Sequence, residues 1–254
     1  MRMSAEFDTN AGDSDLGTAH AELQSLLLEG PDVTSFMQQV AELASTITDP
    51  ACVCGVSMRR EREIETVAKS GDLAVRVDEI QYGRGQGPCL DALHGGVMIH
   101  VPDLAVDERW PEYRSHALAQ GVRSSLSLPL TVRGRTLGGL NLYSPVQHTF
   151  TDAEITQAAA FARQAATSLA LVLRHADQVK LEDQLREAIA TRGVIDQALG
   201  IVMAQRGCTA AEAFTVLREA SQRRNRKLHE IAAELIETIT GQRPQPPRPF
   251  IQRG

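Results

Sequence analysis

The 254-residue sequence predicts an α+β domain, a long coiled-coil helix and then a small all-α bundle of three helices. Three observations lead to this fold class. Short alternating or wholly apolar runs, separated by Gly, Pro and Asp turns, are typical of strands. A helical repeat of apolar residues follows them for about 50 residues with hardly a breaker. Two further amphipathic segments, each with a capping residue, complete the bundle.

The first residues of the sequence are expected to form a polar leader. Residues 1–20 are polar and rich in Gly, Asp and Asn, which is typical of a disordered leader. No apolar run follows the first basic residue, so we expect no secretory signal. No stretch of about 18 consecutive apolar residues occurs, so we expect a cytoplasmic protein that does not span a membrane.

The elements of the α+β domain follow in order. Apolar residues at helical spacing predict a helix that begins at Asp32, its N-cap, and ends at Asp49-Pro50. Five strands are then expected, at residues 51–58, 63–69, 97–101, 124–132 and 136–143. The glycine cluster 83–88 and the segment 103–120 interrupt the sheet. The cluster has neither the Lys-Ser/Thr of a P-loop nor the G-x-G-x-x-G spacing, which argues against a nucleotide phosphate site.

Four segments of this domain resemble a GAF domain of bacterial signalling proteins, namely residues 85–93, 97–113, 121–144 and 150–155. The resemblance implies a central antiparallel sheet flanked by helices. In many members a small-ligand pocket lies between the sheet and the segment that corresponds to 103–120. The candidate ligand-binding residues are then Cys89, Asp103, Trp110 and Tyr113. Members bind bilins, cyclic nucleotides or haem, and nothing in the sequence selects among these, so the cofactor stays open.

The sequence offers no catalytic or metal site. The four cysteines show neither a C-x-x-C pair nor the spacing of a zinc site, and are Cys52, Cys54, Cys89 and Cys208. Cys89 and His94 have the donor atoms for a haem or a metal, but a reduced cysteine of the core is the preferred interpretation. Neither a Ser/His/Asp order nor an H-E-x-x-H motif is present, so we do not expect an enzyme.

A capping box at Thr151 and Glu154 begins the long helix. Its apolar residues step by three and four, and are Ile155, Ala158, Ala162, Ala165, Leu169, Val172, Ala176 and Val179. This seam can pack on the sheet, on a second subunit or on both, and the length of the helix favours a homodimer. The rhythm slips near Lys180. The predicted divisions are a leader (1–20), a sensor domain with its coiled-coil helix (21–179), a second domain (180–241) and a Pro-rich extended tail (242–254).

The last part of the chain, residues 186–254, is basic, whereas the rest of the chain is acidic. Residues 186–254 hold 11 Lys and Arg against 7 Asp and Glu, in a protein of net charge −6. A second capping box, Thr209 and Glu212, begins its middle helix, and Asn225 is placed to cap the third. The predicted bundle core is Ile195, Ala198, Phe214, Leu217, Leu228 and Ile231. Between the last two helices lies the basic segment, residues 223–227, in which four of five residues are cationic.

This domain closely resembles the ANTAR domain, a bacterial RNA-binding output module. The matching positions are Arg192, Ile195, Asp196, Ala198, Gly200, Met203, Glu212, Ala213, Phe214, Leu217, Arg218, Ser221, Asn225, Lys227, Leu228, Ile231 and Ala232. The resemblance implies a protein that dimerises on a signal and binds paired hairpins in nascent RNA, which prevents a terminator from forming. One departure is Leu199, where members often carry lysine. A GAF domain followed by an ANTAR domain implies a one-component regulator of transcription antitermination.

The candidate RNA-binding residues lie in and around the basic segment. Phosphates suit the cations Arg223, Arg224, Arg226 and Lys227, and base edges or sugars suit Ser221, Gln222 and Asn225. Arg192 and Arg218 join them from the family pattern. No aromatic residue lies beside the basic segment, so a stacking platform is not predicted. DNA binding and a protein-interaction adaptor are the alternatives, although the acidic third helix disfavours the major groove.

Overall fold

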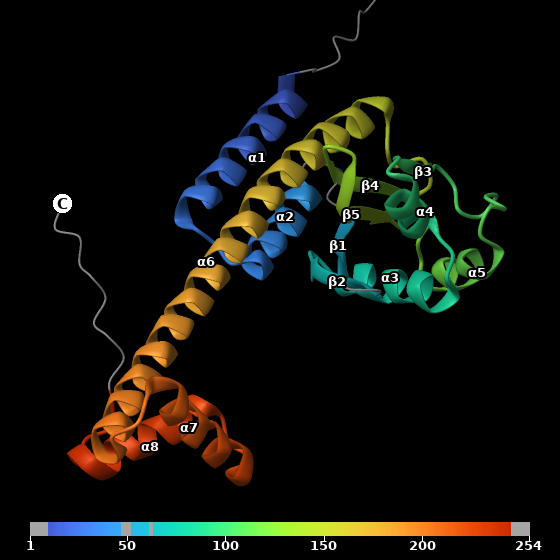
Figure 1. Ribbon diagram of the computed structural model, residues 1–254. Helices are drawn as coiled ribbons and strands as arrows, with labels where there is room; N and C mark the ends of the chain where they lie inside the picture. Colours follow the sequence, from blue (N-terminus) through green and yellow to red (C-terminus); the bar gives the residue numbers. More distant parts are fainter. Residues whose placement is uncertain (1–9, 47–51, 61–62, 245–254) are drawn as a thin grey trace, which may run out of the picture. The chain divides into compact units, whose positions relative to one another are not determined.

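The computed structural model describes residues 10–46, 52–60 and 63–244. They form two compact units, which divide between Ala176 and Asp177. Helix α6 (Asp152–Arg206) contributes to both units (Figure 1). Within the described ranges, no helix combines the length and the hydropathy needed to cross a lipid bilayer.

The first unit is built on a five-stranded sheet in the order β2-β1-β5-β4-β3, and every described pair of neighbouring strands is antiparallel. The expected α+β class and antiparallel sheet are therefore confirmed. At the tip of the central hairpin, Arg133 (φ 50°) and Gly134 (φ 76°) both have positive φ, as a two-residue turn between twisted strands requires. The strands are β1 (Val53–Arg60), β2 (Glu63–Lys69), β3 (Ile99–Val101), β4 (Ser124–Val132) and β5 (Arg135–Ser144).

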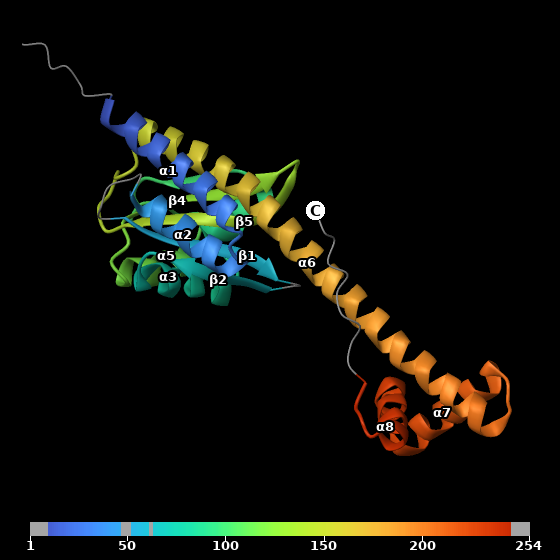
Figure 2. The same cartoon turned by 90° about the vertical axis from the view of Figure 1, so that its left-hand side faces the viewer.

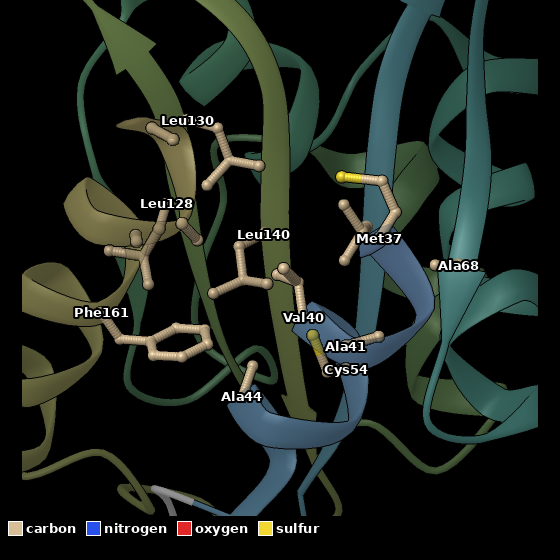
Figure 3. Packing of buried hydrophobic residues seen from close by; sticks show 14 of the residues in the cluster. Met37, Val40, Ala41, Ala44, Cys54, Ala68, Leu128, Leu130, Leu140 and Phe161 are labelled. Carbon is tan, nitrogen blue, oxygen red and sulfur yellow. The ribbon is translucent and has the colours of Figure 1, made fainter. Parts of the chain in front are cut away.

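Helices cover both faces of this sheet. On one face lie α1 (Asn10–Glu29), α2 (Val33–Thr46) and the beginning of α6, and on the other lie α3 (Asp72–Arg84), α4 (Pro88–Gly95) and α5 (Pro111–Ala119) (Figure 2). The main core fills the first face, where Phe161 of α6 and Met37 and Val40 of α2 surround Leu140 of β5 (Figure 3). Because side chains alternate along a strand, the other face of β1 and β5 is left for different residues.

Four helices of this unit were not predicted, namely α1, α3, α4 and α5. Residues 10–20 belong to α1, so the expected disordered leader is wrong for them, and residues 1–9 lie outside the described ranges. The apolar side chains Ala19 and Leu23 anchor α1 in the main core. The glycine cluster is the junction of α3 and α4, because Gly85 (φ 66°) ends α3 in the left-handed conformation and Pro88 begins α4.

The predicted seam of α6 packs against its own domain over its first half. Ala158, Ala165, Leu169 and Val172 are buried in the main core. Leu169 and Val172 are therefore structural residues of the first unit, and replacing them by charged residues would disrupt its fold. Farther along the helix the apolar side chains are exposed, and these are Val179, Leu181, Leu185 and Ile189.

The second unit is a three-helix bundle formed by the last turns of α6, α7 (Ala210–Arg224) and α8 (Leu228–Thr240). The capping box of Thr209 and Glu212 is present at the start of α7. The buried core is Ala198, Val202, Ala213, Leu217, Ile231, Ala232 and Ile236, and the half-buried Leu199 packs against it. Phe214 was predicted to be a core residue, but 41% of it is exposed, because the buried face of α7 is that of Ala213 and Leu217.

Candidate functional site

The turn between α7 and α8 holds the basic segment in a defined conformation. Asn225 has the left-handed conformation (φ 49°) and ends α7, and its N–H donates to the carbonyl oxygens of Ser221 and Gln222. The Ser221 hydroxyl donates to the carbonyl oxygen of Arg226. The prediction that Asn225 caps the third helix is wrong, because Lys227 is the N-cap of α8. Asparagine tolerates the left-handed region better than most residues do, which explains its place at the end of α7.

Two arginines of the basic segment are paired with acidic residues of α8. Glu234 accepts hydrogen bonds from Arg224 and Arg226, each at 2.6 Å. Arg226 also donates to Glu230 at 3.2 Å. The hydrogen bond from Arg224, followed by that from Arg226, lowers the pKa of the Glu234 carboxyl. The acidic face of α8 therefore offsets part of the positive charge of the turn.

The remaining cations of the predicted site form long ion pairs or no ion pair with the described residues. Arg223 lies 3.7 Å from Glu219, and Arg192 lies 3.8 Å from Asp196. Arg218 and Lys227 are exposed and form no ion pair with another described residue. An anionic partner can therefore accept hydrogen bonds from Arg218, Lys227 and the exposed Gln222 without first displacing a carboxylate from them.

We expect Asn225→Gly to leave the stability of the bundle nearly unchanged and Asn225→Ala to lower it by about 1 kcal/mol. Glycine enters the left-handed region freely, whereas alanine meets a steric penalty there. Urea unfolding followed by helical circular dichroism measures both variants against the wild type. Equal destabilisation by glycine and alanine would show that side-chain bonds of Asn225, and not its backbone conformation, stabilise the turn.

In the first unit, a buried polar cluster lies on the sheet face that α3 and α4 cover. Its centre is the carboxyl of Asp78, which is fully buried. It accepts hydrogen bonds from Thr66 at 2.8 Å, from Asn141 at 3.1 Å and from the Tyr143 hydroxyl. No Lys, Arg or His is among the hydrogen-bond or ion-pair partners that the described residues offer it. Burial without a cation raises the pKa of Asp78 to about 7.

Cys89 lies in the same cluster. Its sulfur is 3.1 Å from Asn141 Nδ2 and 3.5 Å from Ser57 Oγ. Burial raises the pKa of its thiol to about 12, so the thiol stays protonated and is a poor nucleophile. The cluster is tightly packed as well, because a Cβ atom on Gly55 would lie 2.5 Å from a carboxyl oxygen of Asp78.

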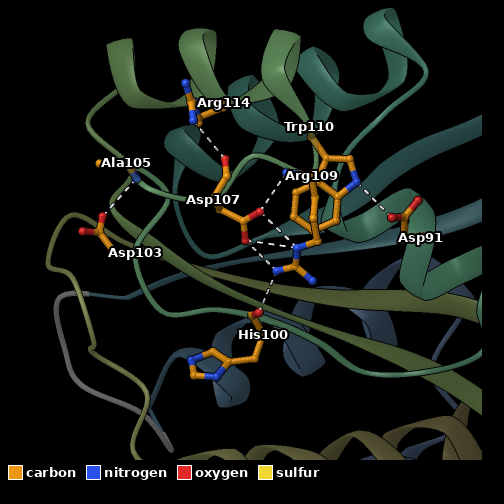
Figure 4. Close-up of polar contacts among 8 residues, drawn as sticks. All are labelled: Asp91, His100, Asp103, Ala105, Asp107, Arg109, Trp110 and Arg114. Carbon is orange, nitrogen blue, oxygen red and sulfur yellow. Dashed lines mark hydrogen bonds and ion pairs between the residues drawn. The ribbon is translucent and has the colours of Figure 1, made fainter.

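The segment 103–120 is fixed by its own polar contacts (Figure 4). Trp110 donates from Nε1 to Asp91 of α4 at 2.9 Å, and the Arg109 guanidinium lies 4.3 Å from the centre of the Trp110 ring. Arg109 also pairs with Asp107 at 2.6 Å. The buried rings of Trp110 and Tyr113 belong to a second, smaller core between α5 and the sheet.

The four predicted ligand residues lie in three different surroundings. Cys89 lies in the polar cluster, while Trp110 and Tyr113 lie in the second core. Asp103 instead pairs with Arg123 at 3.1 Å and lines a surface cavity of about 790 Å³ that the other three do not line. Sequence reasoning missed the polar cluster itself. Its signal was the polar residues at alternate positions of otherwise apolar strands, such as Ser57 and Asn141.

Metal ligation finds no support in the described part of the chain, where no group of three or more His, Cys, Asp or Glu side chains is placed to hold an ion. His94 is exposed and lines a different surface cavity, of about 640 Å³, together with Arg59 and Arg135. The hydroxyl of Tyr113 and Oδ1 of Asn141 are buried and have no hydrogen-bond partner among the residues that the structure describes.

The chain thus joins an α+β domain with a five-stranded antiparallel sheet to a helical module with an exposed basic turn. A model of the GAF domain matches residues 30–170, and a model of the ANTAR domain matches residues 183–236. The first match covers more than half of the chain, which therefore belongs to the GAF domain family, and its second unit contains an ANTAR domain. GAF domains serve signal sensing and ANTAR domains serve RNA-binding antitermination, so both are regulatory domains.

Solved structures share the fold of the first unit. Free methionine-R-sulfoxide reductase from Neisseria meningitidis is 17% identical, with a TM-score of 0.53 over 69% of this chain and 98% of that chain. The chromophore-binding domain of a bacteriophytochrome from R. palustris is 12% identical, with a TM-score of 0.51 over 66% and 64%. The GAF domain of a phosphoenolpyruvate-protein phosphotransferase from Coxiella burnetii is 15% identical, with a TM-score of 0.50 over 66% and 99%. No curated protein matches the chain.

Proposed function

We propose that this protein is a bacterial one-component regulator of transcription antitermination. In this proposal the GAF domain senses a small ligand or another signal, and the ANTAR domain binds hairpins in nascent RNA. The observation that carries the proposal is the exposed basic turn between α7 and α8, which lies within the part of the chain that matches the ANTAR model.

The turn has the chemistry that an RNA hairpin requires. Hairpin loops expose phosphates together with unstacked bases that accept and donate hydrogen bonds. Lys227 and Arg218 meet phosphates directly, and Gln222 offers an amide to a base edge. Phosphates compete with Glu234 for Arg224, which exposed ion pairs allow because each of them contributes only about 0–1 kcal/mol.

Duplex DNA fits this surface less well. A helix that enters the major groove presents basic and amide residues along one face. Helix α8 instead carries Glu230, Glu234 and Glu237, and two of these carboxylates already pair with the turn. An adaptor that docks an acidic protein on the basic turn is the second alternative.

Binding measurements with the full chain separate these functions. We expect a short RNA hairpin to bind, with an affinity that falls as salt rises, and a DNA duplex of the same stem sequence to bind much more weakly. Equal affinity for the duplex would favour a DNA-binding regulator. Failure to bind any nucleic acid at low salt would contradict the proposal and favour the adaptor.

We also propose that the protein is a homodimer through α6. Leu181, Leu185 and Ile189 are spaced by four residues on one side of this helix and are 55%, 55% and 64% exposed. Residues four apart lie on the same helix face, so these side chains form an apolar stripe of the kind that coiled coils bury. A second copy of the chain offers the same stripe in return.

Charged residues in this stripe should break the dimer. We expect Leu185→Glu combined with Ile189→Glu to halve the mass measured by light scattering, because buried like charges oppose helix pairing. Gln184→Glu, on the same helix, serves as the control and should keep the wild-type mass. A monomeric wild type, or a double variant that remains dimeric, would remove this stripe from the proposed interface.

A further inference from the structure

An aromatic side chain is exposed on the same helix that leads into the basic turn. Phe214 lies on α7, one turn before Arg218 and two turns before Gln222. Residues four apart share a helix face, so the ring, the guanidinium and the amide form one row. All three are exposed, and the row ends at the turn formed by Asn225.

The bundle core is complete without this ring. Ala213 and Leu217 of α7 are buried against α6 and α8, while Val216 and Ala220 are half-buried beside them. Phe214 lies at the edge of this contact and is 41% exposed. The ring is thus available to a partner, and aromatic rings are among the largest contributors to binding energy at interfaces.

The charge around the ring indicates the kind of partner. Arg218, one turn away, is exposed and forms no ion pair with another described residue. An apolar protein surface would leave this guanidinium unpaired, whereas a nucleic acid places phosphates close to each base. In RNA loops, unstacked bases lie against aromatic side chains. Each such contact strengthens binding by about tenfold.

We propose that Phe214 is a base-stacking site, on which one unpaired base of the RNA loop lies while Arg218 contacts an adjacent phosphate. This inference rests on the proposed RNA function and extends the binding surface from the basic turn along α7. It also supplies the stacking platform that is absent from the sequence around the basic segment. Phe214, Arg218 and Gln222 are therefore expected to contact the loop of a hairpin and not its stem, because bases within a duplex are stacked on both faces.

Phe214→Leu tests the site, because leucine is apolar and favours helices but has no aromatic face. The probe is an RNA hairpin with the fluorescent base 2-aminopurine at successive loop positions. The wild type should quench one position strongly. Phe214→Leu should lose that quench and bind about tenfold more weakly or worse, with an unchanged dependence on salt. Phe214→Trp should keep both the quench and the affinity.

Ile239→Ala is the matched control, since Ile239 is an exposed apolar residue of α8 that lies off this row. It should bind and quench as the wild type does. If Phe214→Leu quenches and binds like the wild type, or if Phe214→Trp loses binding while folded, the stacking site is wrong. Failure of the wild type to bind any hairpin would instead refute the proposed RNA function, so the two failures are distinguishable. Circular dichroism establishes that each variant is folded.

Discussion

Replacing Asp78 by asparagine should remove most of the pH dependence of sensor-domain stability between about pH 4 and pH 7. Burial raises the pKa of this carboxyl to about 7, from 3.8. The folded protein therefore keeps the proton over a pH range in which the unfolded chain has lost it. The stabilisation is complete at low pH and is lost as pH rises toward 7, with a slope of about 1.4 kcal/mol per pH unit.

The groups around Asp78 determine how asparagine fits. The Tyr143 and Asn141 donors both bond to Oδ1, which asparagine retains as an amide oxygen. The second oxygen, Oδ2, accepts a hydrogen bond from the Thr66 hydroxyl. In the variant this position is an amide nitrogen, which donates. The Thr66 hydroxyl can then accept from that amide and donate its own hydrogen to the Tyr82 hydroxyl, which lies 3.0 Å away. Among charged neighbours, Glu79 raises the pKa of Asp78 further, but less than burial does. The variant should therefore fold and be less sensitive to pH.

Urea unfolding at several pH values measures this effect. The single tryptophan, Trp110, is buried in the first unit, so its fluorescence reports the sensor domain alone. Asp72→Asn is the control: it is an exposed carboxyl whose pKa is lowered by the hydrogen bond from Lys69, so its small stabilisation is lost as pH falls. Parallel pH profiles for the wild type and Asp78→Asn would show that Asp78 is not the titrating group.

The sequence predicted the strands well because alternation is a local signal. In β1, Cys54, Val56 and Met58 face the main core while Gly55 and Ser57 face the other side, and this pattern is visible in a few residues. The helices α3 and α4 were missed because glycines at their junction resemble a loop. Asp78 lies on α3, so the polar cluster could not be predicted without the helix that carries its central residue.

The predictions for Asn225 and Phe214 in the second unit were wrong for the same reason. At each position the sequence pattern is compatible with two local structures. Asparagine is favoured both at the start of a helix and in the left-handed residue after its end, and Asn225 takes the second place. Ala213 and Phe214 are neighbours at the edge of an apolar face, and spacing alone does not say which of them is buried. The small alanine lets α7 approach the other helices closely, which leaves the ring exposed.

Removing Lys227 and Arg218 should weaken RNA binding strongly, whereas removing the carboxylate of Glu234 should strengthen it. Each lost charge-assisted hydrogen bond to a phosphate costs about 1.5 kcal/mol or more, which is roughly tenfold in affinity. We therefore expect Arg218→Ala with Lys227→Ala to bind a hairpin about a hundredfold more weakly. The salt slope of log affinity should also fall by roughly 0.7 to 0.9 for each phosphate contact removed.

Glu234→Gln tests the same surface in the opposite direction. It releases Arg224 from the carboxylate, and it leaves Arg226 with its bond to Glu230 alone, so more of the positive charge of the turn becomes available to phosphates. Hairpin affinity should rise severalfold and its salt slope should become steeper, with little loss of stability, because exposed ion pairs contribute about 0–1 kcal/mol. Arg174→Ala, an exposed cation of α6 in the first unit, should change neither quantity. If Glu234→Gln bound RNA no more tightly than the wild type while Lys227→Ala still weakened it, phosphates would contact only the unpaired cations, and the arginines of the turn would serve to join α7 to α8.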